Sequence, residues 1–207
     1  MKKYLFLSSL ILGLFYPFFK SFIPVLNNMP AHAAPKETSI GTAYSYTMQA
    51  IDKHRKGDYS GAIIDYTKAL EIDPNYTYAL HNRGFAKNMI GDYKGALIDL
   101  NKSIKLNPED TNSYKSRAVA KDGLGDYKGA ILDINFVTDI NSKDLKAIIS
   151  RAKIKSKIKD HAGSIKDYSR VLELDPNNQE AIYGRGVEKY KVKNYLGAID
   201  DFNIGIK

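Results

Sequence analysis

Histidine and aspartate are the residue types in this chain that could supply acid–base or metal chemistry. The histidines are His32, His54, His81 and His161, and neither His54 nor His81 has a second histidine or an acid pair nearby at metal-ligand spacing. The chain contains no cysteine, which excludes a disulfide scaffold, a thiolate metal site and a cysteine nucleophile. It also lacks a glycine-rich phosphate loop. We therefore predict a protein that is not an enzyme and that has no metal site and no cofactor.

Aspartates recur every 34 residues along the chain, and arginines recur at the same interval of 34 residues. A catalytic pair of carboxylates would occur once in the chain. Five aspartates at equivalent repeat positions therefore indicate a structural role. The planar guanidinium of arginine suits a partly buried, bidentate contact with such a carboxylate. Pairing between consecutive units is preferred, because the first unit has Gln49 in place of arginine, and pairing within a unit is the alternative. The preferred pairs are Asp65–Arg83, Asp99–Arg117, Asp133–Arg151 and Asp167–Arg185.

The same interval organises the chain from residue 43 to residue 207. The triplet Gly57-Asp58-Tyr59 recurs at residues 91–93 and 125–127, and degenerate copies stand at residues 159–161 and 193–195. From Tyr59 to Leu70, apolar residues recur at the spacing of one face of a helix. We therefore predict five units, each a pair of antiparallel helices, at residues 43–76, 77–110, 111–144, 145–178 and 179–207.

Prolines mark the ends of most units. Pro74, Pro108 and Pro176 follow the second helix of their units, where proline disfavours a helical residue before it and cannot continue the hydrogen-bond ladder. The third unit has Ser142 at this position. We therefore expect its second helix to run on or to fray.

The pattern of small, aromatic, small and proline residues resembles the tetratricopeptide repeat family. In the first unit these positions are Ala62, Tyr66, Ala69 and Pro74. The resemblance covers residues 43–207 and is closest to bacterial, especially cyanobacterial, members of the family. It implies an all-α fold, a right-handed α-solenoid of five helix-turn-helix repeats. It also implies a groove lined by the first helix of each unit, which takes a peptide segment of a partner.

The segment 1–33 predicts export. A positive start at Lys2 and Lys3, an apolar run to Tyr16 and small residues at Ala31 and Ala33 follow the order of a secretory signal peptide. An uncleaved membrane anchor is the alternative, because residues 4–26 could reach across a membrane. Residues 34–42 are interpreted as a polar linker. The cyanobacterial resemblance implies the periplasm or the thylakoid lumen as the compartment.

The charge balance is too modest for a dedicated nucleic-acid binder. The chain carries 31 basic and 23 acidic residues, a net charge of +8. Without residues 1–33, which hold three lysines and no acid, 28 basic residues face 23 acidic ones, a net charge of +5. We predict a protein or peptide partner and no nucleic acid. Membrane contact is expected only if the N-terminal segment is retained.

Two surfaces are candidates for binding. On the predicted groove, aromatic residues gather in the early units and lysines around the fourth, an arrangement that could anchor an apolar side chain and orient an acidic segment. Its residues are Tyr44, Tyr78, His81, Asn82, Phe85, Asn88, Lys115, Lys146, Lys153, Lys157, Tyr183 and Tyr190. We interpret the chain as a non-enzymatic scaffold or adaptor that aids complex assembly. The alternative is self-association through the last helix, at Tyr195, Ile199, Phe202 and Ile206.

Overall fold

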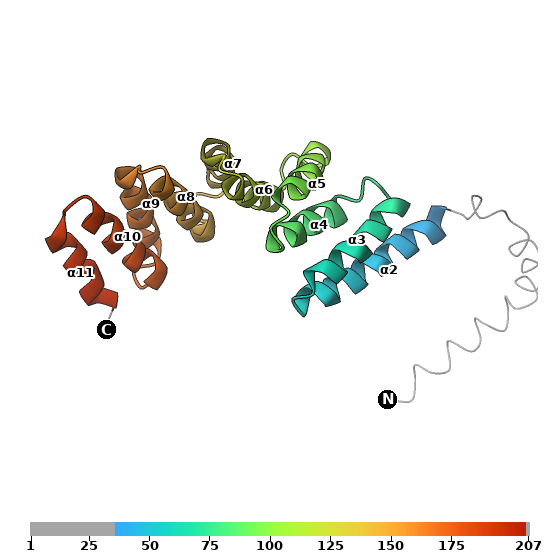
Figure 1. The fold of residues 1–207 in the computed structure, drawn as a ribbon, viewed down its shortest axis with the longest axis horizontal. Coiled ribbons are helices and arrows are strands. Elements are labelled where there is room, and N and C mark those ends of the chain that lie inside the picture. The colour runs from blue at the N-terminus through green and yellow to red at the C-terminus, as the bar shows by residue number, and fades with distance from the viewer. Residues whose placement is uncertain (1–35, 206–207) are drawn as a thin grey trace, which may run out of the picture. The chain divides into compact units, whose positions relative to one another are not determined.

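The computed structural model describes residues 36–205, and this part of the chain consists of ten α-helices joined by short turns (Figure 1). Residues 43–205 belong to one compact unit. The predicted signal peptide and Ile206 lie outside the described residues. The helices follow one another in pairs: α2 (Lys36–Arg55) and α3 (Tyr59–Ile72), α4 (Thr77–Met89) and α5 (Tyr93–Leu106), α6 (Thr111–Gly123) and α7 (Tyr127–Ile140), α8 (Leu145–Lys157) and α9 (His161–Leu174), α10 (Gln179–Lys191) and α11 (Tyr195–Gly205).

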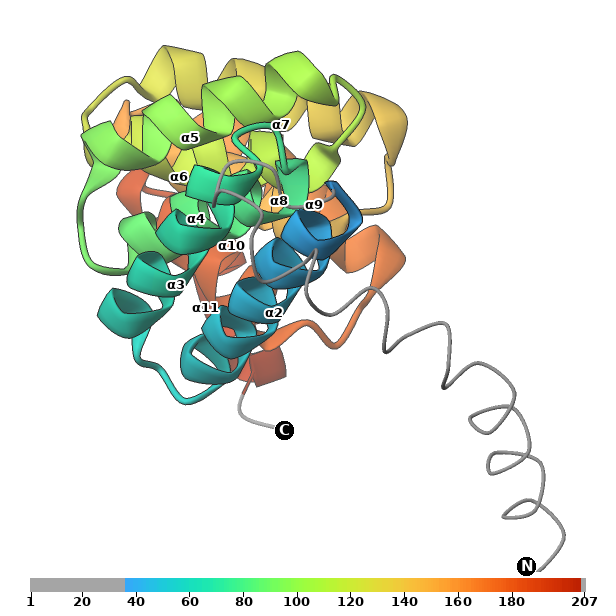
Figure 2. The same ribbon diagram turned by 90° about the vertical axis from the view of Figure 1, so that its right-hand side faces the viewer.

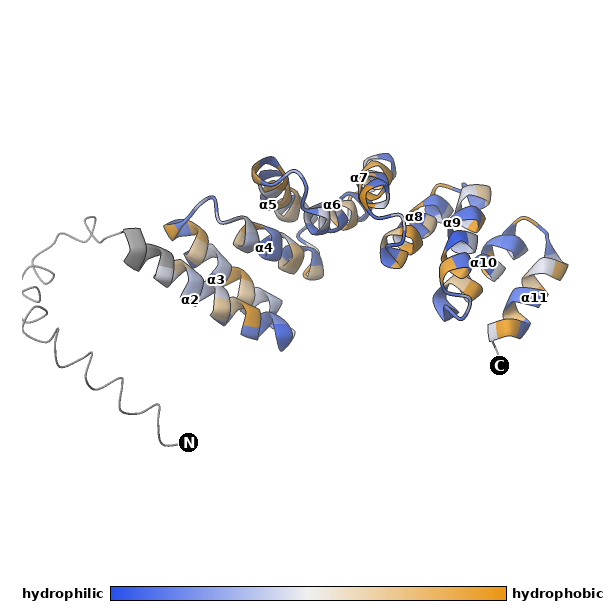
Figure 3. Ribbon diagram, turned by 180° about the vertical axis from the view of Figure 1, so that it is seen from behind, coloured by the Kyte–Doolittle hydropathy of each residue, from blue (hydrophilic) through white to orange (hydrophobic). Residues whose placement is uncertain are grey.

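From α3 onward, each helix packs against the next one along the chain, and the first helices α4 and α6 also contact each other. This arrangement confirms an all-α repeat solenoid. Viewed along the stack, α5 and α7 lie at the outer edge, whereas α6 and α8 lie toward the middle (Figure 2). Most helices carry both hydrophobic and hydrophilic residues, as amphipathic helices packed on one side do (Figure 3). No helix among the described residues is long and apolar enough to cross a membrane.

The second helix of each unit begins in the same way. In α3, the side chain of Asp58 caps the helix by accepting a hydrogen bond from the Gly61 amide at 2.8 Å. A Cβ atom on Gly61 would lie 2.1 Å from Asp58 Oδ2, so glycine lets the aspartate keep this orientation. The same cap and glycine recur at α5, α7 and α9, and an asparagine takes the aspartate's place before α11.

The core is built from small residues between paired helices and larger ones beside them. Ala50 and Ala62 are fully buried against Tyr66 in the first unit. In the second unit, a Cβ atom on Gly84 would lie 2.7 Å from Leu100, so glycine allows a close approach of α4 and α5. This alternation of small and large side chains fixes where the first helices lie relative to one another.

Helix α2 begins at Lys36, within the stretch 34–42 that is predicted to be a linker. One sequence expectation about a helix end was wrong. The second helix of the third unit was expected to run on or fray, but α7 ends at Ile140, in register with α3 and α5. The turn still closes with Ser142 at the proline position, because the Asn141 side chain accepts a hydrogen bond from the Lys143 amide at 3.1 Å, as Asp73 does from the Asn75 amide at 3.0 Å in the first unit.

Candidate functional site

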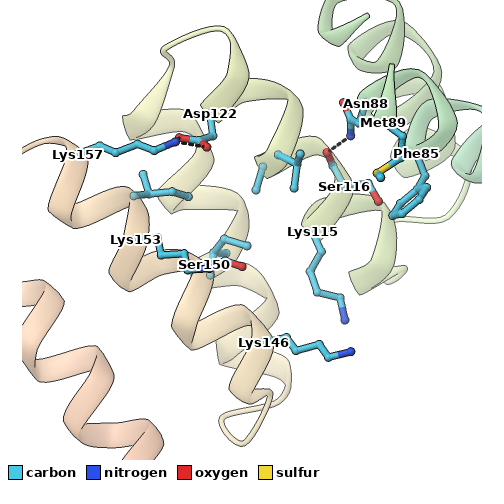
Figure 4. Close-up of a pocket in the computed structure, with 14 residues that line it drawn as sticks. Phe85, Asn88, Met89, Lys115, Ser116, Asp122, Lys146, Ser150, Lys153 and Lys157 are labelled. Carbon is cyan, nitrogen blue, oxygen red and sulfur yellow. Dashed lines mark hydrogen bonds and ion pairs between the residues drawn. The ribbon is translucent and has the colours of Figure 1, made fainter. Parts of the chain in front are cut away.

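A pocket opens on the face that the first helices form. Its volume is about 330 Å³, and α4, α6 and α8 supply every lining residue except Ile134 of α7 (Figure 4). The volume lies at the low end of the range for ligand pockets. Most of the exposed lining is apolar. The lining residues are Phe85, Asn88, Met89, Lys115, Ser116, Ala118, Val119, Asp122, Ile134, Lys146, Ser150, Lys153, Ile154 and Lys157.

Half of the predicted groove residues line this pocket. These six are Phe85, Asn88, Lys115, Lys146, Lys153 and Lys157. The other six belong to the same set of first helices but lie outside the pocket. They are Tyr44, Tyr78, His81 and Asn82 toward the N-terminal end and Tyr183 and Tyr190 on α10. The pocket therefore lies on the second, third and fourth units, and the predicted groove residues of the first and fifth units are not part of it.

Sequence reasoning did not select Met89, Ser150 and Ile154. The signal for Ser150 was available, because Ser116 and Ser150 occupy equivalent positions in α6 and α8, where α4 has the larger Asn82. Two small side chains in successive helices leave room above them. Met89 is 51% exposed and contributes apolar surface at the end of α4. Reading side-chain size down each repeat position, rather than charge and aromaticity alone, would have located the pocket.

Three of the four pocket lysines are already paired with acids. Lys157 Nζ contacts Asp122 Oδ2 at 2.6 Å, and Lys115 Nζ contacts Asp144 Oδ2 at 3.0 Å. Lys153 pairs with Glu180. Burial by itself raises the pKa of Asp144, but hydrogen bonds from the Ala147 amide and Lys115 outweigh it and lower the pKa below its usual value.

Lys146 makes no ion pair with any of the described residues. It is the second residue of α8, and its side chain extends away from the helix (Figure 4). The unpaired positive charge of the pocket is therefore localised at one position.

Asn88 is the most buried polar side chain of the pocket wall apart from Ser116. It is 8% exposed, and its Nδ2 atom donates a hydrogen bond to the Ser116 carbonyl at 2.8 Å. Its Oδ1 atom is buried without a partner among the described residues. A buried acceptor that lacks a donor is destabilising.

The two histidines next to the pocket support its wall. His81 Nε2 lies 3.3 Å from Ser116 Oγ, and the His54 ring stacks on Phe85 with centroids 5.1 Å apart. Burial lowers the pKa of both histidines, so both are neutral near pH 7. Among residues 41–205, no group of three or more acidic or histidine side chains could hold a metal ion.

The arginine–aspartate pairs that support the face lie within units, so the preferred pairing between units was wrong. Arg83 binds Asp99 through two hydrogen bonds of 2.6 and 2.8 Å, and Lys87 binds the same carboxylate at 2.8 Å. The remaining guanidinium nitrogen, Nη1, donates to Thr67 Oγ1 of the preceding unit at 3.0 Å. The arrangement recurs at Arg117–Asp133, Arg151–Asp167 and Arg185–Asp201.

The predicted self-association surface is partly exposed. Tyr195 is 52% exposed and Ile199 is 53% exposed, and Leu196, which sequence reasoning omitted, is 79% exposed. Phe202 instead packs inward, because its ring lies 5.9 Å from that of Tyr183 and against Gly186. The exposed apolar side chains of α11 therefore include Leu196 and Ile204 but not Phe202.

Two segments match family models of known repeats. Residues 53–88 match the model described as TPR repeat, and residues 145–178 match the model described as Tetratricopeptide repeat. No curated protein sequence matches the chain.

Solved structures share the fold at low sequence identity. MamA 41-end from Desulfovibrio magneticus RS-1 is 18% identical with a TM-score of 0.74, over 80% of this chain and 93% of that one. YrrB, described as a TPR protein with an unusual peptide-binding site, is 20% identical with a TM-score of 0.65, over 78% and 83%. PilF of Pseudomonas aeruginosa is 15% identical with a TM-score of 0.70, over 82% and 77%. The repeat matches therefore show tetratricopeptide repeats at residues 53–88 and 145–178, and the solved structures share the fold of the repeat region.

Proposed function

We propose that this chain is a non-enzymatic scaffold that holds a partner protein by a peptide segment bound across α4, α6 and α8. The observation that carries the proposal is the apolar pocket of about 330 Å³ on the face of the first helices. Tetratricopeptide repeat proteins are generally non-catalytic interaction modules. The solved structure of YrrB is described as having a peptide-binding site, which supports the same use of this fold.

The exposed apolar side chains of the pocket favour binding over a purely structural role. Val119 is 51% exposed at the centre of α6, where a solvated helix face would carry a polar residue. Aromatic and aliphatic side chains in a concave, partly dry site supply most of the binding energy of peptide anchors. A partner that inserts an apolar side chain would cover this surface.

The test is selection of random peptides on the full chain, followed by binding assays on two matched variants. Val119→Asp places a charge in the pocket, and Leu132→Asp makes the same kind of change at a 68% exposed position on α7, outside the pocket. We expect Val119→Asp to weaken the affinity for the selected peptides at least about tenfold and Leu132→Asp to leave this affinity unchanged. Equal binding to both variants would place the site elsewhere.

We further propose that the chain acts outside the cytoplasm, in the periplasm or the thylakoid lumen, and aids assembly of a complex there. The support is the signal-like order of residues 1–33 in the sequence. N-terminal sequencing of the mature protein tests it, with a start at Ala34 as the expected result. A start at Met1 in membrane-bound material would favour the anchor instead.

Self-association is a second candidate function, favoured by the exposed side chains at the start of α11. Tyr195, Leu196 and Ile199 are each more than half exposed, and an identical surface on a second copy could cover them. Light scattering over a range of concentrations tests this candidate. A mass that rises with concentration in the original chain but not in Leu196→Asp would support it, and a constant monomer mass would exclude it.

A further inference from the structure

The two ends of the pocket differ in charge. At the C-terminal ends of α6 and α8, Lys157 and Asp122 bridge the two helices through contacts of 2.6 and 2.7 Å (Figure 4). Lys146 and Lys115 lie toward the N-terminal ends of the same helices. Lys115 has Asp144 as its partner, whereas Lys146 has none among the described residues. The pocket is therefore electrically polarised along the direction of α6 and α8.

The middle of the pocket accepts an apolar group. Val119 and Met89 are half exposed there, and the other apolar lining residues are Phe85, Ala118, Ile134 and Ile154. Ser116 and Ser150 keep the space above them open, because their side chains are small. An apolar side chain placed here would bury these groups without displacing an ion pair.

We infer that the partner segment is an acidic peptide with one large apolar side chain, bound so that a nearby Asp or Glu carboxylate meets Lys146 at the N-terminal end of α8. This inference rests on the proposed function and gives the bound segment its chemistry and direction. The apolar side chain enters between Val119 and Met89. The carboxylate supplies the partner that Lys146 lacks, and it can share Lys115 with Asp144 because Lys115 is one-third exposed.

Three synthetic peptide libraries on the full chain test the inference. Each has a fixed central leucine flanked by random positions that include Gly, Ser and Asn. The acidic library adds Asp and Glu at these positions, the basic library adds Lys and Arg, and the neutral library adds Gln. We expect the acidic library to bind at least about tenfold more tightly than the other two. Lys146→Glu should reverse the preference toward the basic library. Lys94→Glu is the matched control, because it makes the same charge change at an exposed lysine of α5 that has no ion pair among the described residues. This variant should keep the preference for the acidic library.

The outcomes separate this inference from the proposed function. Equal binding of all three libraries, abolished by Val119→Asp, would overturn the acidic specificity and keep the peptide groove. A preference for the acidic library that Lys146→Glu does not change, or that Lys94→Glu changes equally, would also overturn the inference. If no library binds, or if Val119→Asp has no effect, the proposed function fails and the inference fails with it.

Discussion

Arg83 and Asp99 form a two-point contact within one repeat, with Nη2 at 2.6 Å from Oδ1 and Nε at 2.8 Å from Oδ2. The Asp99 side chain is 2% exposed and the Arg83 side chain is 17% exposed, so the pair is largely buried. The third nitrogen of Arg83 reaches Thr67 in the preceding repeat at 3.0 Å. One side chain therefore fixes the two helices of its own repeat and contacts the repeat before it.

Replacing Arg83 with methionine should destabilise the chain by about 3 kcal/mol, because it leaves a buried carboxylate with Lys87 as its remaining partner. Urea unfolding measures the change. Lys94→Met removes a positive charge from an exposed position of the adjacent helix and should change stability by less than about 0.5 kcal/mol. Equal effects of the two substitutions would mean that the pair adds no stability.

A glycine at Lys159 should stabilise the chain. Lys159 has a φ of 62° in the turn where Gly57, Gly91 and Gly125 have φ values of 79–81°. A side chain in this left-handed region costs about 1 kcal/mol relative to glycine, so Lys159→Gly should raise the free energy of unfolding by up to that amount. Lys166→Gly, within helix α9, should lower it and serves as the control. A loss of stability in Lys159→Gly would contradict the turn geometry.

A larger side chain at Ala130 should force α6 and α7 apart. Ala130 is fully buried in the core cluster that contains Ala118 and Ile134. Ala130→Leu should therefore cost about 1–3 kcal/mol through overpacking. Thermal unfolding provides the measurement, and an unchanged midpoint would show that the position is not between packed helices.

Acid should weaken the contact between the last two repeats at Glu188. Its carboxylate is 4% exposed and accepts hydrogen bonds of 2.7 Å from Ser156, His161 and Lys191. Burial raises the pKa of Glu188, but these donors outweigh burial and lower the pKa below its usual 4.5.

A lowered pKa means that the native state binds the proton less tightly than the unfolded chain. The stabilisation is therefore complete above the unfolded pKa and is lost as pH falls through the lower, folded value. Glu188→Gln should be less stable than the original chain near pH 7 and should lose less stability between about pH 5 and about pH 3. Parallel pH profiles from urea unfolding would show that Glu188 does not contribute.

The repeat period predicted where α4, α6, α8 and α10 begin, because the turn glycines and the apolar face recur with it. It could not decide the arginine partner, since Arg83 lies almost midway between Asp65 and Asp99 in the sequence. Only the packing of α4 against α5 separates those two partners. The aromatic and basic groove residues were predicted from side-chain type, but the pocket itself depends on the small Ser116 and Ser150 and on the inward direction of Ile154.

The central claim is that a peptide binds across α4, α6 and α8, and methyl NMR of the full chain tests it most directly. The tightest peptide from the random selection would be titrated against chain labelled at its Ile, Leu, Val and Met methyl groups. We expect shifts at Met89, Val119 and Ile154 in the pocket and unchanged signals at Ile98 and Leu132, which are exposed on α5 and α7. Shifts at Ile98 and Leu132 without shifts in the pocket would contradict the claim.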